Sequence, residues 1–125
     1  MTVLVVDDAE DCIVTMDLAL QQLPDVVIRP ARSAEAALSE LEDQKSGTFS
    51  AVITDIHLPE MTGLELVSRI RNDPRFCTLP ILVVSADTDP STPARALGLG
   101  ANAYFAKPFS PSAIRKKLEE LIHAS

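Results

Sequence analysis

Four apolar runs in this sequence are each followed by a polar residue that could take part in chemistry. Asp7 and Asp8 follow the first run, Asp55 the second, Ser85 the third and Lys107 the fourth. Three carboxylates brought close together repel one another, and a hard divalent cation such as Mg²⁺ relieves this repulsion. A lysine and a serine hydroxyl beside them would bind an incoming phosphoryl group. The carboxylate of Asp55 could accept that group as a nucleophile.

Each of these residues also has an ordinary structural interpretation. Asp7 and Asp8 could cap a helix, and Asp55 could form a turn or a helix cap. Ser85 could be a turn residue, and Lys107 a solvated loop charge. Taken singly, these interpretations are the more frequent ones, but they do not account for all five residues lying at the ends of apolar runs.

The apolar runs themselves predict strands. They are short, rich in β-branched residues and continuous rather than alternating, which is typical of strands buried on both faces. We predict five strands, with the second closed by Pro30, at residues 3–6, 26–28, 51–54, 81–84 and 102–106.

Helical periodicity and capping signals fill the intervals between these strands. Thr62 and Glu65 form a capping box, and Ser110 precedes a proline at the first helical position. The fourth helix is expected to be short, because Pro93 confines its start and Gly98 weakens its interior. The predicted helices span 9–23, 33 to 45–47, 62 to 72–74, 91–93 to 100, and 110 to about 122.

This alternation predicts an α/β fold with a doubly wound, three-layer (βα)5 architecture and a mostly parallel sheet in one domain, residues 1–125. Right-handed crossovers place the carboxyl ends of parallel strands at one edge of the sheet. Ligands bind at that edge in open α/β sheets. The five polar residues are therefore expected to form one rim.

The composition narrows the function classes. The chain has 125 residues, 46% of them hydrophobic, a formal net charge of −7 and a pI near 4.7. An acidic domain does not suit a phosphate backbone or an anionic membrane surface as a direct partner. No apolar run approaches the roughly 18 residues that span a bilayer, so we expect a cytoplasmic protein. Cys12 and Cys77 lack metal-ligand spacing and are expected to be reduced structural thiols.

These residues give the chain a resemblance to the receiver domain of bacterial two-component response regulators, over essentially its whole length. Asp55 begins the motif Asp-x-x-Leu-Pro-x-Met-x-Gly, and Lys107 begins a Lys-Pro pair. The resemblance implies the flavodoxin-like strand order 2-1-3-4-5 and makes Asp55 the phosphoacceptor. It also implies that Asp7, Asp8, Asp55 and the backbone carbonyl of His57 hold Mg²⁺, and that Lys107 contacts the phosphoryl group through a loop whose Lys-Pro bond is usually cis.

The resemblance extends to residues that would respond to phosphorylation. Ser85 matches the switch hydroxyl, and Tyr104 matches the aromatic residue that changes rotamer on activation. His57 and Asp87 stand two residues after Asp55 and Ser85, at positions associated with the lifetime of the phosphoryl group. His57 departs from the family's more usual Asn, Arg or Met.

The function implied is that of a phosphorelay signalling domain, which catalyses only its own phosphorylation and dephosphorylation. A histidine kinase or phosphotransfer protein would donate the phosphoryl group. The face formed by the fourth helix, fifth strand and fifth helix would then signal to a downstream domain or protein, or form a phosphorylation-dependent dimer. Both a stand-alone regulator and the N-terminal receiver of a longer protein fit this sequence.

Three other protein classes share parts of this pattern. A haloacid-dehalogenase-type phosphatase has Asp-x-Asp after the first strand, whereas the acidic pair here is adjacent. A flavodoxin needs a phosphate-binding loop at that place, which the acidic stretch 7–11 could not supply. The remaining alternative is a pseudo-receiver, a protein-interaction module that works without phosphorylation.

Overall fold

Five parallel strands form a single sheet in the order β2-β1-β3-β4-β5. The structure is a computed structural model that describes residues 1–43 and 49–123. The strands are β1 (Thr2–Val6), β2 (Val27–Ala31), β3 (Ala51–Thr54), β4 (Ile81–Ser85) and β5 (Ala103–Ala106). The predicted fold class and strand order are both confirmed.

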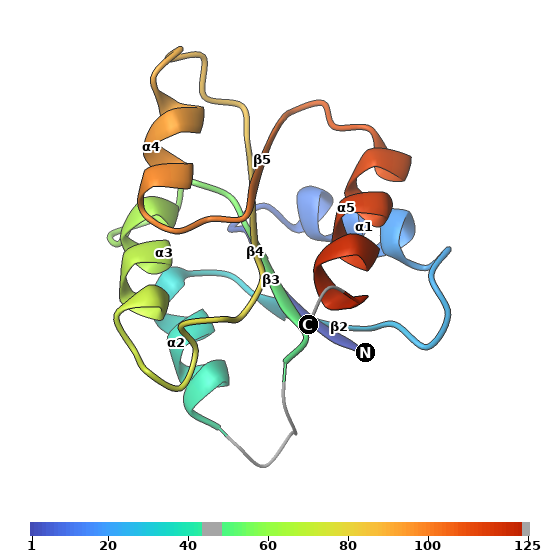
Figure 1. Cartoon of the computed structure of the whole chain (residues 1–125). Helices are drawn as coiled ribbons and strands as arrows, with labels where there is room; N and C mark the ends of the chain where they lie inside the picture. Colours follow the sequence, from blue (N-terminus) through green and yellow to red (C-terminus); the bar gives the residue numbers. More distant parts are fainter. Residues whose placement is uncertain (44–48, 124–125) are drawn as a thin grey trace.

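Helices cover both faces of this sheet. Figure 1 shows α2, α3 and α4 on one side and α1 and α5 on the other. Their bounds are α1 (Glu10–Leu20), α2 (Ala34–Glu42), α3 (Gly63–Arg71), α4 (Thr92–Gly98) and α5 (Pro111–His123). The chain is therefore the predicted three-layer sandwich, and α4 is as short as expected.

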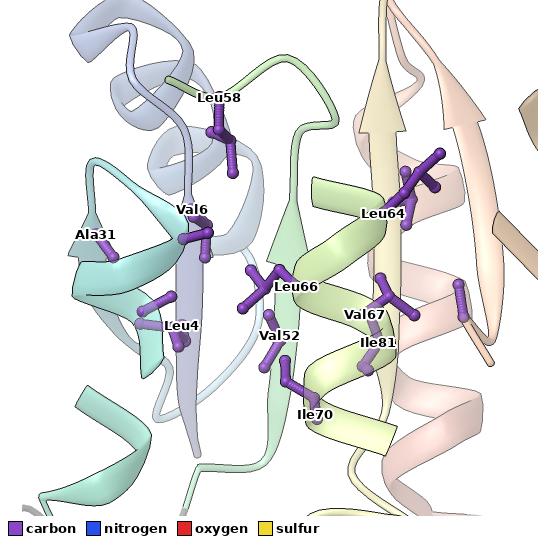
Figure 2. Packing of buried hydrophobic residues seen from close by; sticks show 14 of the residues in the cluster. Leu4, Val6, Ala31, Val52, Leu58, Leu64, Leu66, Val67, Ile70 and Ile81 are labelled. Atoms are coloured by element: carbon purple, nitrogen blue, oxygen red, sulfur yellow. The ribbon is translucent and has the colours of Figure 1, made fainter. Parts of the chain in front are cut away.

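The central strands are buried on both faces and divide the core into two clusters. Every residue of β3 and β4 is buried. Alternate side chains point to opposite layers, so that Leu4 and Val6 join the cluster under α2 and α3 while Val3 and Val5 join the cluster under α1 and α5. In Figure 2, apolar side chains of α3 pack against β3 and β4. Full burial of such a side chain contributes about 1.5–3 kcal/mol, so the sheet is a rigid support for its edge.

The predicted helix starts are confirmed by their capping geometry. The side-chain oxygens of Ser33, Thr62 and Ser110 each accept a hydrogen bond from the backbone N–H three residues further on, at 3.0, 3.2 and 3.3 Å. Each bond satisfies a donor that has no partner within the helix. These caps fix where α2, α3 and α5 begin relative to the strands that precede them.

The ends of two predicted elements are wrong by more than two residues. β2 does not close at Pro30 but continues to Ala31, with Pro30 in register with Val5 of β1. β2 is an edge strand, where a missing N–H can face solvent, so proline is tolerated. The first helix ends at Leu20 rather than at residue 23, and a turn fills the interval before Pro24.

The second helix ends at Glu42, and its predicted stop at residues 45–47 lies outside the described residues. Among residues 1–43 and 49–123, no helix is both long enough and apolar enough to cross a membrane.

Candidate functional site

The backbone hydrogen bonds of the sheet continue one residue beyond three of the strands and hold the site residues in place. The N–H of Asp7 donates to the carbonyl of Ala31 at 3.0 Å, and the N–H of Asp55 donates to the carbonyl of Val6 at 3.0 Å. The N–H of Lys107 donates to the carbonyl of Ser85 at 2.9 Å. These residues are therefore part of the rigid sheet edge, as the sequence predicted.

Three carboxylates meet at this edge. Asp7 and Asp55 are 5% and 9% exposed, while Asp8 is exposed. One carboxylate oxygen from each lies within 4.8 Å of the other two. Opposite ligands of an octahedral Mg²⁺ stand about 4 Å apart, so the cluster has nearly the right size and the right donor chemistry for this cation with several waters.

Lys107 lies against the cluster and neutralises part of its charge. Its Nζ is 3.0 Å from Oδ2 of Asp7, 3.4 Å from Oδ2 of Asp55 and 3.4 Å from Sγ of Cys12. Burial alone would lower the pKa of the ammonium group, but the hydrogen bond to Asp7 and the negative charges of Asp55 and Asp7 raise it to about 12. Lys107 is thus a fixed positive charge beside Asp55.

The loop after Asp55 folds back closely on the acceptor. Oδ1 of Asp55 accepts a hydrogen bond from the N–H of Ile56 at 2.7 Å, and the N–H of Gly63 donates to the carbonyl of Ile56 at 2.9 Å. A Cβ atom added to Gly63 would clash with the backbone carbonyl of Asp55. Only glycine fits at the start of α3, so the glycine that ends the motif is required for steric reasons.

Ser85 and Tyr104 lie on neighbouring strands beside the acceptor. Ser85 is fully buried, and Tyr104 packs on the face covered by α3 and α4. Burial raises the pKa of the Tyr104 phenol, a hydrogen bond with the Ser85 side chain opposes this, and the charges of Asp87 and Asp55 add to the rise. Tyr104 thus lies on the same face of the sheet as Val83 and Ser85.

The structure also brings His57 and Asp87 together. Nε2 of His57 is 3.5 Å from Oδ2 of Asp87, although the two residues lie on different loops. His57 is the more exposed partner, with 62% of its side chain accessible against 22% for Asp87. The two positions predicted to affect phosphoryl lifetime thus lie in contact with each other.

Cys12 is the site residue that sequence reasoning missed. It was predicted to be a structural thiol, and it is a free cysteine whose Sγ contacts Lys107. It also lines a cavity of about 250 Å³ that extends from the site towards α1 and α5, below Asp7, Asp55 and Lys107. Its place in the first turn of the helix after the acidic pair was the only available signal.

Comparisons with known proteins agree with this geometry. The family model described as "Response regulator receiver domain" matches residues 3–119. The chain is 34% identical over 122 residues to the chemotaxis protein CheY1 of Helicobacter pylori, covering 98% of this chain and 97% of the relative. It is 34% identical over 125 residues to a CheY homologue of Campylobacter jejuni, covering 98% and 92%.

Solved structures show the same likeness. A protein of Chloroflexus aurantiacus described as a response regulator superposes with a TM-score of 0.88 at 33% identity, covering 98% of this chain and 97% of the other. The chemotaxis response regulator CheY4 of Vibrio cholerae gives a TM-score of 0.82 at 28% identity, covering 96% and 97%. The chain therefore belongs to the response regulator receiver family and is a CheY-like signalling domain.

Proposed function

We propose that this domain takes a phosphoryl group onto Asp55 from a histidine kinase or phosphotransfer protein, with Mg²⁺ as cofactor. The observation that carries this proposal is the meeting of Asp7, Asp8 and Asp55 with Lys107 at one sheet edge, where the carboxylate oxygens lie within 4.8 Å of one another and Lys107 within 3.4 Å of Asp55.

The proposed Mg²⁺ ligands are carboxylates of Asp7, Asp8 and Asp55 and the backbone carbonyl of His57. When bound, the cation supplies positive charge that offsets the oxygens of the transferring group and of the crowded carboxylates. Asp8 is the most accessible of the three carboxylates. Both oxygens of Asp7 are already engaged, Oδ1 by the N–H of Ala9 and Oδ2 by Lys107.

The residues of the chain carry the remaining steps. A carboxylate oxygen of Asp55 attacks phosphorus, the bond to the donor's nitrogen or oxygen breaks, and the donor keeps that electron pair. Lys107 is held within reach of the new phosphoryl oxygens by Asp7, and Ser85 offers its hydroxyl as a donor. Because Asp55 and Lys107 are fixed before the donor arrives, little reorganisation of these two groups is needed.

His57 and Asp87 are proposed to set how long the phosphoryl group persists. Their side chains lie 3.5 Å apart between the loops after Asp55 and after Ser85. In this proposal, the water that hydrolyses the acyl phosphate reaches it past these two loops. Replacing either residue should therefore change the dephosphorylation rate more than the phosphorylation rate.

The output is proposed to leave through the face formed by α4, β5 and α5. Phosphorylation would draw the Ser85 hydroxyl towards Asp55 and bias Tyr104 between two rotamers. Leu97 and Leu99, 48% and 40% exposed at the end of α4, provide apolar area on the surface of this helix. A downstream domain, a separate protein or a second phosphorylated copy would read the change.

Incubation with acetyl phosphate and Mg²⁺ followed by intact-mass measurement tests the proposed reaction. The wild type should gain one phosphoryl group, Asp55→Asn should gain none, and omission of Mg²⁺ should abolish the gain. Asp25→Asn is the matched control, because Asp25 is an exposed aspartate at the opposite end of β1 and has a positive φ that asparagine accepts. A wild type that stays unmodified under these conditions would favour the phosphorylation-independent interaction module.

A further inference from the structure

The cavity of about 250 Å³ below the acceptor site is far larger than the voids that close packing normally leaves. Protein interiors are packed as densely as organic crystals, and voids larger than one water molecule are few. The cavity lies in the layer of α1 and α5, which Figure 1 shows side by side on one face of the sheet. Its apolar wall comes from three strands, from α1 and from the loop after β5, through Val5, Ile53, Val84, Cys12, Met16 and Phe109.

The deep part of the cavity is apolar. Val5 and Ile53 are partners in the register of β1 and β3, and they are 3% and 2% exposed. Met16 of α1 belongs to the same buried core cluster, and Phe109 packs against that cluster. Such walls offer water few hydrogen-bond partners. An apolar group that displaced this water would therefore be stabilised by the hydrophobic effect.

The other end of the cavity is polar and carries an excess of negative charge. Side chains two residues apart on a strand point to the same face, so Asp7 and Asp55 stand above the apolar residues two positions earlier in β1 and β3. Asp11, which is exposed, also lines the cavity, and Lys107 adds one positive charge. Three carboxylates beside one ammonium group repel an anion.

These two ends define the chemistry of a ligand. An apolar cavity of about 150 Å³ is large enough to bind benzene, so one aromatic ring fits here. Each carboxylate oxygen has two lone pairs, so Asp7 and Asp55 can accept a hydrogen bond in addition to those from Lys107. A hydrogen-bond donor on the ring therefore suits the polar end, whereas a negative charge does not.

We propose that this cavity is a binding site for a small uncharged aromatic molecule that carries a hydrogen-bond donor, of which phenol is the simplest example. The ring lies against the apolar wall, and the hydroxyl group donates to a carboxylate oxygen of Asp7 or Asp55. The site is formed by the packing of the unmodified chain, so binding does not depend on phosphorylation of Asp55.

Amide NMR with phenol as the probe tests the site in the protein without metal or phosphoryl donor. Phenol should shift the amides of Cys12, Ile53 and Phe109 with a dissociation constant on the order of 1 mM, because so small a ligand makes few contacts. The amides of Ala37 and Val67, in the core cluster on the other face of the sheet, should stay in place. The absence of a saturable shift around the cavity, or shifts spread over both faces, would overturn the proposal.

Two related probes test the chemistry assigned to the ligand. Benzoate has the same ring with a negative charge and should bind roughly tenfold more weakly than phenol, or not at all. Fluorobenzene has nearly the shape of phenol but no donor, and it should also bind more weakly. Benzoate that binds as tightly as phenol would contradict a negatively charged polar end. Fluorobenzene that does so would contradict the hydrogen bond to the carboxylates.

Filling the cavity should prevent binding. Cys12→Leu adds volume at the wall, whereas Cys77→Leu makes the same change at an exposed cysteine that does not line the cavity. Phenol should bind Cys77→Leu as it binds the wild type, and it should bind Cys12→Leu roughly tenfold more weakly or not at all. Unchanged binding by a folded Cys12→Leu would overturn the assignment of this cavity.

The two native cysteines provide a second measurement that needs no variant. Iodoacetamide alkylates a cysteine when the sulfur displaces iodide, and peptide mass spectrometry gives the rate at Cys12 and at Cys77 separately. Saturating phenol should slow the alkylation of Cys12, which lines the cavity, and leave that of the exposed Cys77 unchanged. An unchanged rate at Cys12 would place the bound phenol elsewhere and overturn the proposal.

The consequence for the acceptor rests on the proposed function. A ligand that holds a carboxylate of Asp7 or Asp55 competes with the groups that these carboxylates bind during the reaction, so saturating phenol should slow phosphorylation by acetyl phosphate. Phenol should have no such effect on Cys12→Leu. An unchanged rate in the wild type would contradict contact between the ligand and the acceptor carboxylates. A wild type that is not phosphorylated at all would contradict the proposed function, and the binding measurements would still decide the site.

Discussion

The two halves of the site are held in different ways. The acceptor half, comprising Asp7, Asp55, Lys107 and Gly63, is fixed by the sheet ladder, by buried ion pairs and by a contact that admits no side chain at residue 63. The switch half, from Ser85 through α4 to Tyr104, is held at its start by bonds between residues two apart.

The difference assigns one task to each half. Chemistry at Asp55 benefits from groups that are already in place, since reorganisation during the reaction adds to the barrier. Communication requires a segment with two arrangements of similar free energy. α3 illustrates the first case, with five buried residues and a side-chain cap, whereas α4 has two buried residues and lacks such a cap.

Replacing one glycine in each half should give the largest difference in stability between the two halves. Gly63→Ala places a Cβ against the backbone of Asp55, which cannot move without displacing the acceptor, and should cost about 3 kcal/mol of stability. Gly98→Ala meets no atom within 4 Å and should stabilise the protein by about 0.5–1 kcal/mol. Urea unfolding measures both values. A tolerated Gly63→Ala would show that the acceptor half is not rigidly packed.

Removal of Arg71 should release the anchored end of the switch half. Arg71 donates to the carbonyls of Gly100 and Phe76 and to Oδ1 of Asn102. Arg71→Ala should cost about 2 kcal/mol and speed hydrogen exchange in α4. Arg71→Lys should not rescue it, because one ammonium cannot reach the three acceptors that the planar guanidinium does. Full rescue by lysine would mean that the positive charge of Arg71 matters and its hydrogen-bond geometry does not.

The two adjacent aspartates should behave in opposite ways in the absence of metal. Asp7→Ala removes contacts to Lys107 and to the N–H of Ala9 and should cost about 1 kcal/mol. Asp8→Ala removes an exposed like charge and should leave stability unchanged or slightly raised. Mg²⁺ titration should show the reverse order, with the greater loss of affinity in Asp8→Ala. Stronger Mg²⁺ binding by Asp8→Ala would exclude Asp8 as a direct ligand.

The smallest expected effect concerns Tyr104, which is the only tyrosine in a chain without tryptophan. Burial, followed by the charges of Asp87 and Asp55, raises the phenol pKa above its ordinary value of about 10. The neutral phenol thus stabilises the fold fully below about pH 10 and loses this effect as the pH rises through the folded-state pKa.

Absorbance titration of the phenolate tests this directly. Its midpoint should lie above that of the unfolded chain and should fall in Asp87→Asn, which removes one nearby charge. Asp89→Asn is the matched control and should leave the midpoint unchanged. An unshifted midpoint in the wild type would place Tyr104 away from the site, and the switch half would lose its link to Ser85.

The sequence predicted the acceptor half better than the switch half, for physical reasons. Strands buried on both faces are continuous apolar runs, and parallel strands bring their carboxyl ends to one edge, so the positions of Asp55 and Lys107 followed from pattern alone. The contact of Cys12 with Lys107 depends on how α1 packs beside α5 and the residues that follow β5, which periodicity does not specify.

The details of the switch half depend on side-chain geometry. The period-two bonds from Ser85 to Ser91 require a particular loop conformation, and the sequence shows only a polar, proline-containing stretch there. Arg71 is one of several basic residues near the end of α3, and nothing in the sequence marks it as the one that reaches Gly100. The end of β2 was predicted too early because proline was taken as a strand stop, whereas an edge strand accommodates Pro30.

The identity of the phosphorylated residue is the most direct test of the account. After reaction with acetyl phosphate and Mg²⁺, borohydride reduction converts an aspartyl phosphate to homoserine, and peptide mass spectrometry then locates the change. Phosphorylation of Asp55 predicts homoserine at position 55 and unmodified aspartate at positions 7 and 8. Homoserine at position 7 or 8, or a stable phosphoryl group on another side chain, would contradict Asp55 as the acceptor.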